Sequence, residues 1–338
     1  MNKECKYFSF IVIAISFVLN IVPAISCNVP VFRYALERWP ADLYEVVVYH
    51  RGPLSEKDAP VLDRLEKSSS KSVSYANFRV ISADLSSDIP PELQSLWETL
   101  DEPALPCLVL CYPKNILYRG SIWSGPLTME SVKALVDSPA RQQIARGIIE
   151  GDSAVWVLVE SGDSAKDDTA ARMIQTQLSN LENTLTLPDA VQGNQSSSPV
   201  DVSQGLDVHI AFSIVRVSRD NPAESIFIAM LMHSESDLYD YTSYPMTFPV
   251  FGRGRALYAL IDEGITERNM QAAGMFLTGA CSCEVKALNP GIDILITADW
   301  EKGIYESWIQ EEDLPPLVGL SELVQAVDTS ESISRSTG

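Results

Sequence analysis

The chain has 338 residues, of which 45 are Asp or Glu and 25 are Lys or Arg, so its formal net charge is −20. This balance disfavours nucleic acids and anionic lipid surfaces as partners, because both are bound through clustered Lys and Arg. The apolar fraction of 46% is typical of folded domains, and the length suffices for two of them.

The N-terminus has the pattern of a secretory signal peptide over residues 1–26. Two lysines precede an apolar run over residues 7–22, and Ala24 and Ser26 are small residues at positions −3 and −1. We therefore expect cleavage before Cys27 and export across a membrane. The alternatives are soluble secretion and an uncleaved helix, for which the run is short of the roughly 20 residues that a span needs.

Residues 23–27 also resemble the lipobox of bacterial lipoproteins, whose cysteine is acylated before the signal is removed. The resemblance covers four residues, and Ala24 stands where that motif usually has leucine. It implies a lipid on Cys27 that anchors the mature protein to a membrane of the cell envelope, in the periplasm or another extracytoplasmic compartment. Disulfides are permitted in such an oxidising compartment.

The first half alternates strand and helix patterns. Short β-branched and aromatic runs predict strands, and N-cap residues before amphipathic runs predict helices. The expected elements are strand Tyr44–His50, a helix over 57–67 capped by Ser55, strand Phe78–Ala83, helix Pro91–Leu100, strands Cys107–Tyr112 and Tyr118–Ile122, helix Met129–Val136 capped by Thr128, and a helix that starts at Ser138.

This order over residues 40–150 resembles the thioredoxin fold. Gly52-Pro53 follows the first strand, where thioredoxins have the Gly-Pro between their active cysteines, and Pro106 precedes the third strand, where that family keeps a cis proline. The resemblance implies an α/β domain with a mixed central sheet flanked by helices. However, Arg51 and Leu54 fill the cysteine positions, so this site lacks the thiolate that disulfide exchange needs.

The second half repeats this order of elements. The matches are 154–167 with 45–58, strand His209–Val217 with 78–83, Pro249 with Pro106 as a second cis proline, and helix Gly264–Leu277 with 129–136, besides a helix over 169–185 and a strand over 292–298. We therefore expect two tandem thioredoxin-like domains, 27–150 and 151–327. The polar residues 189–205 predict a mobile loop, and 328–338 a disordered tail.

The motif Cys281-Ser282-Cys283 is the candidate for catalysis. Two cysteines one residue apart can close a strained ring, and strained disulfides are easily reduced. A soft-metal site is the second interpretation, but no histidine is near in sequence to complete a ligand set, so no metal ligands are assigned. The third interpretation is that the two cysteines form a structural disulfide or are buried thiols. Cys107 and Cys111 share one face of a strand and are expected to be small buried hydrophobes.

Four basic residues are candidates for binding. Arg253 and Arg255 alternate with two glycines and could hold a carboxylate or an acidic segment of a partner. His50 and Arg51 end the first strand, at the face where the resembled fold has its active site. A hairpin turn and a solvated capping pair are the structural alternatives.

These features favour an exported, membrane-tethered binding or accessory protein, which uses degenerate thioredoxin-like domains as interaction surfaces. An envelope protein is the expected partner, no cofactor is expected, and the oligomeric state is left open. The alternatives are an extracytoplasmic thiol–disulfide redox protein acting through Cys281 and Cys283, or soft-metal handling at the same pair.

Overall fold

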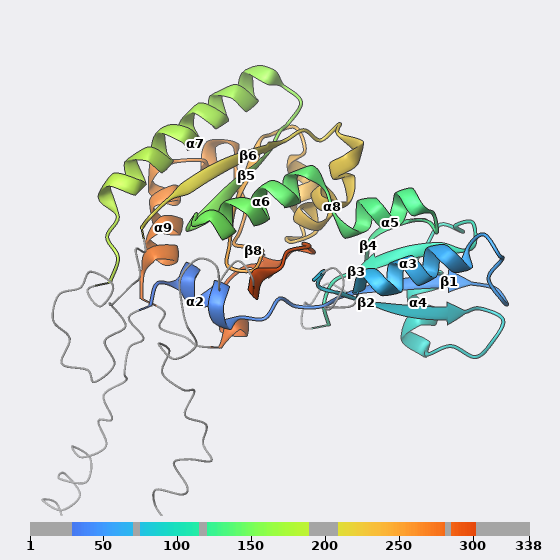
Figure 1. Ribbon diagram of the computed structural model, residues 1–338. Helices are drawn as coiled ribbons and strands as arrows, with labels where there is room; N and C mark the ends of the chain where they lie inside the picture. The colour runs from blue at the N-terminus through green and yellow to red at the C-terminus, as the bar shows by residue number, and fades with distance from the viewer. Residues whose placement is uncertain (1–28, 70–74, 115–119, 189–208, 281–284, 302–338) are drawn as a thin grey trace, which may run out of the picture.

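The computed structural model describes residues 29–69, 75–114, 120–188, 209–280 and 285–301. Within these ranges the chain is an α/β protein with two mixed sheets and helices on their faces (Figure 1). The expected signal peptide, Cys27, the expected loop at 189–205, the Cys281 and Cys283 pair and the expected tail lie outside the described residues.

The first sheet is built from the first half of the chain. Its elements in chain order are β1 (Tyr44–His50), α3 (Ala59–Ser69), β2 (Phe78–Asp84), α4 (Pro91–Glu98), β3 (Cys107–Cys111), β4 (Ser121–Pro126) and α5 (Met129–Val136). The strand order is β2-β1-β3-β4, with β1 and β2 parallel and β3 antiparallel to both of its neighbours. We call residues 44–136 the first unit.

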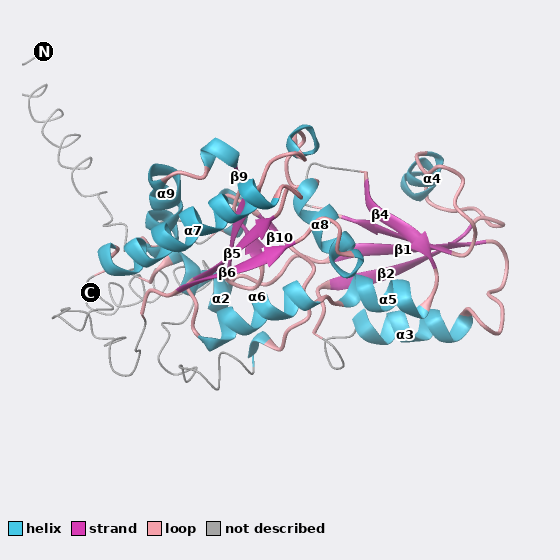
Figure 2. Cartoon of the chain, turned by 90° about the horizontal axis from the view of Figure 1, so that it is seen from above, coloured by secondary structure: helices cyan, strands magenta, loops and turns pink. Residues whose placement is uncertain are grey.

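Both faces of the first sheet are covered because successive side chains on a strand alternate between them. Val46 and Val48 pack in one cluster with residues of α3 and α5, whereas Val47 and Tyr49 pack with residues of α4. Figure 2 shows α3 and α5 on one side of these strands and α4 on the other. A strand buried on both faces explains the continuous apolar sequence of β1.

The second sheet is longer and collects elements from both ends of the described chain. Its elements are α2 (Val31–Arg38), α6 (Pro139–Glu150), β5 (Ala154–Val159), α7 (Ser164–Thr184), β6 (Phe212–Val217), α8 (Ser225–Met232), β7 (Met246–Phe251), β8 (Arg255–Ala256), β9 (Leu260–Ile261), α9 (Glu267–Thr278) and β10 (Ile292–Asp293). The strand order is β10-β8-β7-β5-β6, and β9 also pairs with β7. We call this group the second unit.

Helices α2 and α6 pack on the second sheet, although the sequence places both in the expected first domain. Residues of α2 share a cluster with Trp156 and Phe251, and the Val31 N–H donates to the Gly279 carbonyl at 3.0 Å. Helix α6 packs against β5 and β6. The two units are therefore not consecutive segments of the chain, because α2 and α6 pack with the second sheet.

The two units share the same central pairing. In each, a first strand is parallel to the second and antiparallel to the third: β1 with β2 and β3, and β5 with β6 and β7. Tyr49 is opposite Cys107 in the first unit, and Val159 is opposite Met246 in the second. These pairs give equivalent positions for comparing the two sites below.

One continuous apolar core joins the units. It runs from the α3–α5 face of the first sheet to the α6–α8 face of the second. Polar contacts cross the same junction: the Tyr44 hydroxyl donates to the Asp293 carbonyl at 2.7 Å, and the Asn77 amide donates to the Ile294 carbonyl at 3.1 Å. The Tyr112 hydroxyl also donates to the Met230 carbonyl. Such buried hydrogen bonds fix the relative placement of the two sheets.

Candidate functional site

The loop after β1 is the first candidate site, and residues 51–54 form it. Its backbone is held from β2: the Gly52 N–H donates to Asp84 Oδ1 at 2.8 Å and to Ser86 Oγ at 2.9 Å. The hydrogen bonds of the Ser86 hydroxyl and N–H, and then of the Gly52 N–H, hold the pKa of Asp84 at about 2. Gly52 has φ +68°, which favours glycine there.

His50 and Arg51 are positioned differently within this site. The His50 ring lies 2.8 Å from the Gly52 carbonyl through Nδ1 and 2.8 Å from Ser82 Oγ through Nε2. Arg51, by contrast, is exposed. His50 therefore stabilises the loop, and Arg51 is the side chain of the pair that is exposed to solvent.

The segment before β3 lies beside this loop. The antiparallel register, with Tyr49 opposite Cys107, brings Pro106 next to the end of β1, and the Leu105–Pro106 peptide bond is cis. Among the described residues this is the only cis bond, so the bond before Pro249 is trans. The prediction of a cis proline at Pro249 is therefore wrong.

The register explains this error. Pro249 lies inside β7, opposite Trp156, whereas the position equivalent to Pro106 is the residue before Met246, which is Pro245. The match of Pro249 to Pro106 rests on residue identity, and it is displaced along the strand from the structural equivalence.

In the second unit the corresponding segments are joined by basic side chains. Arg219 Nε donates to the Glu160 carbonyl at 2.7 Å and its Nη2 to the Tyr244 carbonyl at 3.2 Å. Lys166 donates to the Ser243 carbonyl at 3.2 Å and lies 4.6 Å from the centre of the Tyr244 ring. In the first unit, no hydrogen bond within the described residues joins 51–54 to 104–106. The corresponding segments of the first unit are therefore not joined to each other by hydrogen bonds of this kind.

Arg253 and Arg255 are engaged inside the protein. Arg255 is 6% exposed, and its three guanidinium nitrogens donate to the Pro290 and Asn289 carbonyls and to Asp293 Oδ1. Arg253 donates to the Leu36 and Glu37 carbonyls and to Glu301. These contacts favour the hairpin-turn alternative over an anion-binding role.

The two cysteines within the described ranges are buried free thiols. Burial raises the pKa of Cys107 to about 11. Burial, followed by the charge of Glu45, raises the pKa of Cys111 to about 12. Both thiols are therefore neutral near pH 7 and unsuited to nucleophilic chemistry. Cys281 and Cys283 lie outside the described residues, so their predicted role stays a prediction.

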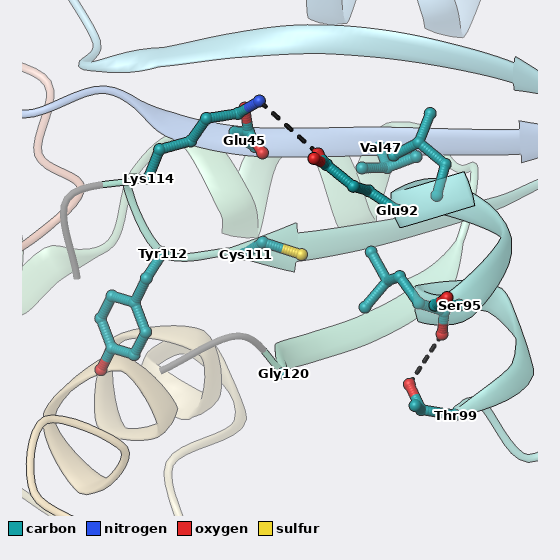
Figure 3. A pocket seen from close by; sticks show the side chains of 11 residues that line it. Glu45, Val47, Glu92, Ser95, Thr99, Cys111, Tyr112, Lys114 and Gly120 are labelled. Atoms are coloured by element: carbon teal, nitrogen blue, oxygen red, sulfur yellow. Dashed lines mark hydrogen bonds and ion pairs between the residues drawn. The ribbon is translucent and has the colours of Figure 1, made fainter. Parts of the chain in front are cut away.

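A cavity of about 750 Å³ between α4 and the first sheet is the second candidate site (Figure 3). We call it the α4 cavity. Val47 and Cys111 form its floor, and Leu93 and Leu96 line it from α4. Helix α4 has no fully buried residue, so it covers the sheet incompletely. The Tyr49 hydroxyl donates to the Leu93 carbonyl at 2.7 Å and so ties α4 to the same face of the sheet.

Charged groups gather at one end of the α4 cavity. Lys114 Nζ lies 3.8 Å from Glu45 Oε1 and 3.9 Å from Glu92 Oε2. Arg79 also contacts Glu45. Figure 3 shows Lys114 reaching over the strands toward Glu92, whereas the Tyr112 ring points away toward another helix. An apolar floor with a few polar groups at one end is typical of small-molecule sites.

Sequence reasoning missed the α4 cavity because its charged residues come from a strand, a helix and the turn after a different strand. No cluster of three or more His, Cys, Asp or Glu side chains with metal-binding geometry occurs in the described ranges. Likewise, the helices described here include none that is both long and apolar enough to span a bilayer.

No protein-family model matches the sequence, and the search of curated proteins gives no significant match.

Proposed function

We propose that this chain is an exported binding protein with two thioredoxin-like domains, of which the first presents a non-redox interaction surface to an envelope protein. The surface consists of residues 51–58 and 101–106. A lipid on Cys27 anchors the protein to the membrane, as the N-terminal pattern suggests.

Topology supports the fold assignment. The order β2-β1-β3-β4, with one parallel and two antiparallel pairings, is what the resemblance over residues 40–150 implies. The cis bond before Pro106 agrees with the same resemblance. The central pairing recurs as β6-β5-β7-β8 in the second unit, which supports a second domain of this kind.

The observation that carries the proposed function is the chemistry of the loop after β1. Arg51 and Leu54 occupy the positions that the resemblance assigns to the redox cysteines, and Arg51 is exposed. Of the two cysteines that the structure describes, Cys107 lies opposite Tyr49 near this loop, and its thiol is buried with a raised pKa. An exposed arginine in a well-held loop suits protein recognition, because Arg is enriched at interfaces.

A pull-down from an envelope extract of the source organism tests the surface. We compare wild type with Arg51→Glu and with Arg172→Glu, a control with the same charge change on an exposed position of α7. The expected result is a partner that wild type and Arg172→Glu retain and Arg51→Glu loses. Equal recovery by all three proteins would exclude the proposed surface.

A reductase assay separates this function from thiol chemistry. The mature protein is expected to show no insulin-reductase activity. Activity that disappears in Cys283→Ser would instead support the redox alternative. Membrane tethering is checked separately: Cys27→Ser should move the protein from the detergent phase to the soluble phase.

A further inference from the structure

We propose that the end of the second unit around α2 lies against the lipid bilayer, with the side chains of Met275 and Leu288 in contact with acyl chains. The contacting segments are residues 271–280 and 285–290, which we call the α2 surface because both flank α2. The proposal rests on the proposed lipid anchor at Cys27, and it adds which part of the folded protein that anchor brings to the membrane.

The described chain begins beside the α2 surface. Val29 is two residues after Cys27, so their Cα atoms lie at most about 7 Å apart. Directly after Val29, Pro30 forms a β-bridge with Ala280, which follows the end of α9. A lipid on Cys27 therefore enters the bilayer next to the C-terminal end of α9.

The most exposed large apolar side chains of the described residues belong to the α2 surface. Leu288 is 74% exposed, Met275 58% and Val285 56%, and no other large apolar side chain in the described ranges exceeds half exposure. Single exposed apolar residues are normal on a protein surface. Three that gather beside a lipid attachment point indicate contact with an apolar phase.

Packing places the two segments at the same end of the second unit. In α9 the Phe276 ring lies 6.3 Å from the Phe251 ring, which lies 6.5 Å from the Trp39 ring after α2. The Arg255 guanidinium lies 5.8 Å from the Trp39 ring and donates to the Asn289 carbonyl at 2.8 Å. Figures 1 and 2 show α2 and α9 together at the end of the molecule away from the first sheet.

The α2 surface carries little charge, although the chain as a whole has a net charge of −20. Residues 269–280 contain no charged side chain, and residues 285–290 contain only Lys286. Lys286 pairs with two carboxylates, and α2 has two arginines and one glutamate, so these charges sum to zero. A bilayer can therefore approach this surface without meeting an excess of carboxylates, and the contact does not depend on anionic lipid.

This orientation leaves the proposed partner-binding loop away from the bilayer. At the start of β1 the Tyr44 hydroxyl donates to the Asp293 carbonyl of the second unit at 2.7 Å. The loop that contains Arg51 follows the other end of this 7-residue strand, about 20 Å farther on. Contact of the α2 surface with lipid thus keeps Arg51 accessible to a partner protein.

Photo-crosslinking in vesicles tests the proposal on the mature chain, residues 27–338, with Cys281 and Cys283 replaced by serine. Cys27 is coupled to a maleimide phospholipid in phosphatidylcholine vesicles, which also contain a lipid with a diazirine in its acyl chain. We expect crosslinked peptides from the α2 surface and none from α5. No crosslink at the α2 surface, or an equal yield on α5, would refute the proposal.

Three variants with the same type of substitution localise the contact. Met275→Glu and Leu288→Glu should each lower the crosslinking yield at the α2 surface at least about fivefold, because a carboxylate is disfavoured among acyl chains. Met129→Glu is the matched control, since Met129 is 49% exposed on α5 of the first unit. Circular dichroism checks that all three variants are folded. Equal yields in the three variants would overturn the assignment.

Two further measurements separate this proposal from its alternatives. In sedimentation without vesicles the mature chain should be a monomer, whereas a dimer that Leu288→Glu dissociates would assign the α2 surface to a second copy and overturn the proposal. Mass spectrometry of the protein from its source membrane reads the lipid on Cys27. An unmodified Cys27 would refute the proposed natural anchor, while the maleimide tether still decides whether the α2 surface contacts acyl chains.

Discussion

Replacing Asp293 by alanine should destabilise the protein strongly, because this carboxylate organises a buried junction. Its oxygens accept hydrogen bonds from the Asp42 N–H at 2.7 Å, from Arg255 Nη1 at 3.0 Å and from Lys286. The Asp293 and Arg255 side chains are only 3% and 7% exposed. The alanine variant would leave the Arg255 guanidinium buried without its carboxylate.

Breaking a buried ion pair from one side costs about 3–5 kcal/mol. Arg255 keeps its two carbonyl partners and lies 5.8 Å from the Trp39 ring, so it cannot easily turn to solvent. We therefore expect the free energy of unfolding to fall by about 3–5 kcal/mol in Asp293→Ala. Urea titration followed by circular dichroism and tryptophan fluorescence measures this change.

Two further variants isolate the cause of that loss. Arg255→Met combined with Asp293→Leu removes both charges, and it should be less destabilising than Asp293→Ala because no unpaired guanidinium remains. Arg216→Ala removes a surface arginine that pairs with Glu160 and Asp168 at 42% exposure, and it should cost less than about 1 kcal/mol. If Asp293→Ala costs no more than Arg216→Ala, the buried-charge reasoning is wrong.

Three other predictions concern buried or well-held groups. In a variant whose other cysteines are replaced by serine, Cys107 and Cys111 should resist a thiol reagent at pH 8 until guanidinium is added. Folding raises the pKa values of both thiols. The free energy of unfolding of this variant should therefore fall as the pH rises above about 8.5. Asp84 should titrate near pH 2 by NMR. Its ionised carboxylate should stabilise the folded protein above about pH 4, and this stabilisation should be lost as the pH falls toward 2. The variant Ser86→Ala should raise the pH midpoint of the Asp84 titration. Arg141→Met should lower the free energy of unfolding in urea by at least about 2 kcal/mol, because this fully buried arginine donates to the carbonyls of residues 134, 135 and 295. Reagent labelling of native Cys107, an Asp84 midpoint near 4, or an unchanged urea midpoint in Arg141→Met would each contradict the corresponding argument.

Several strands and capped helices could be predicted from local sequence. Strand β1 coincides with the expected Tyr44–His50, and α5 coincides with the expected Met129–Val136. Thr128 and Ser138 cap their helices through side-chain oxygens, as their positions suggested. Such signals are local, since a cap or a β-branched run acts within a few residues.

Helices α2 and α8 could not be predicted in the same way. Helix α8 is apolar around most of its circumference, because it lies in the core shared by the two units. It therefore lacks the period by which surface helices are recognised. Helix α2 has no side-chain cap, and its packing partners are distant in sequence. Their placement depends on tertiary contacts that spacing does not encode.

The candidate sites likewise differ in whether local sequence predicts them. Arg51 could be found from the sequence because the Gly-Pro pair beside it is a local motif. The partners of Arg253 and Arg255 could not, since they come from α2 and from residues 289–301. A glycine-arginine run looks like an anion cradle in sequence, but in the structure the guanidiniums hold distant backbone together.

A comparison of the two units argues for a division of roles between them. In the second unit Arg219 and Lys166 link the segments that follow β5 and precede β7 through hydrogen bonds to backbone carbonyls. In the first unit the equivalent loop is held by Asp84, Ser86 and His50, and Arg51 is exposed. Recognition needs a surface that is ordered yet not already paired, because ordering and desolvation both reduce affinity. Under the proposed function, the loop of the first unit meets that condition, and the second unit, joined to it through a continuous core, would support it.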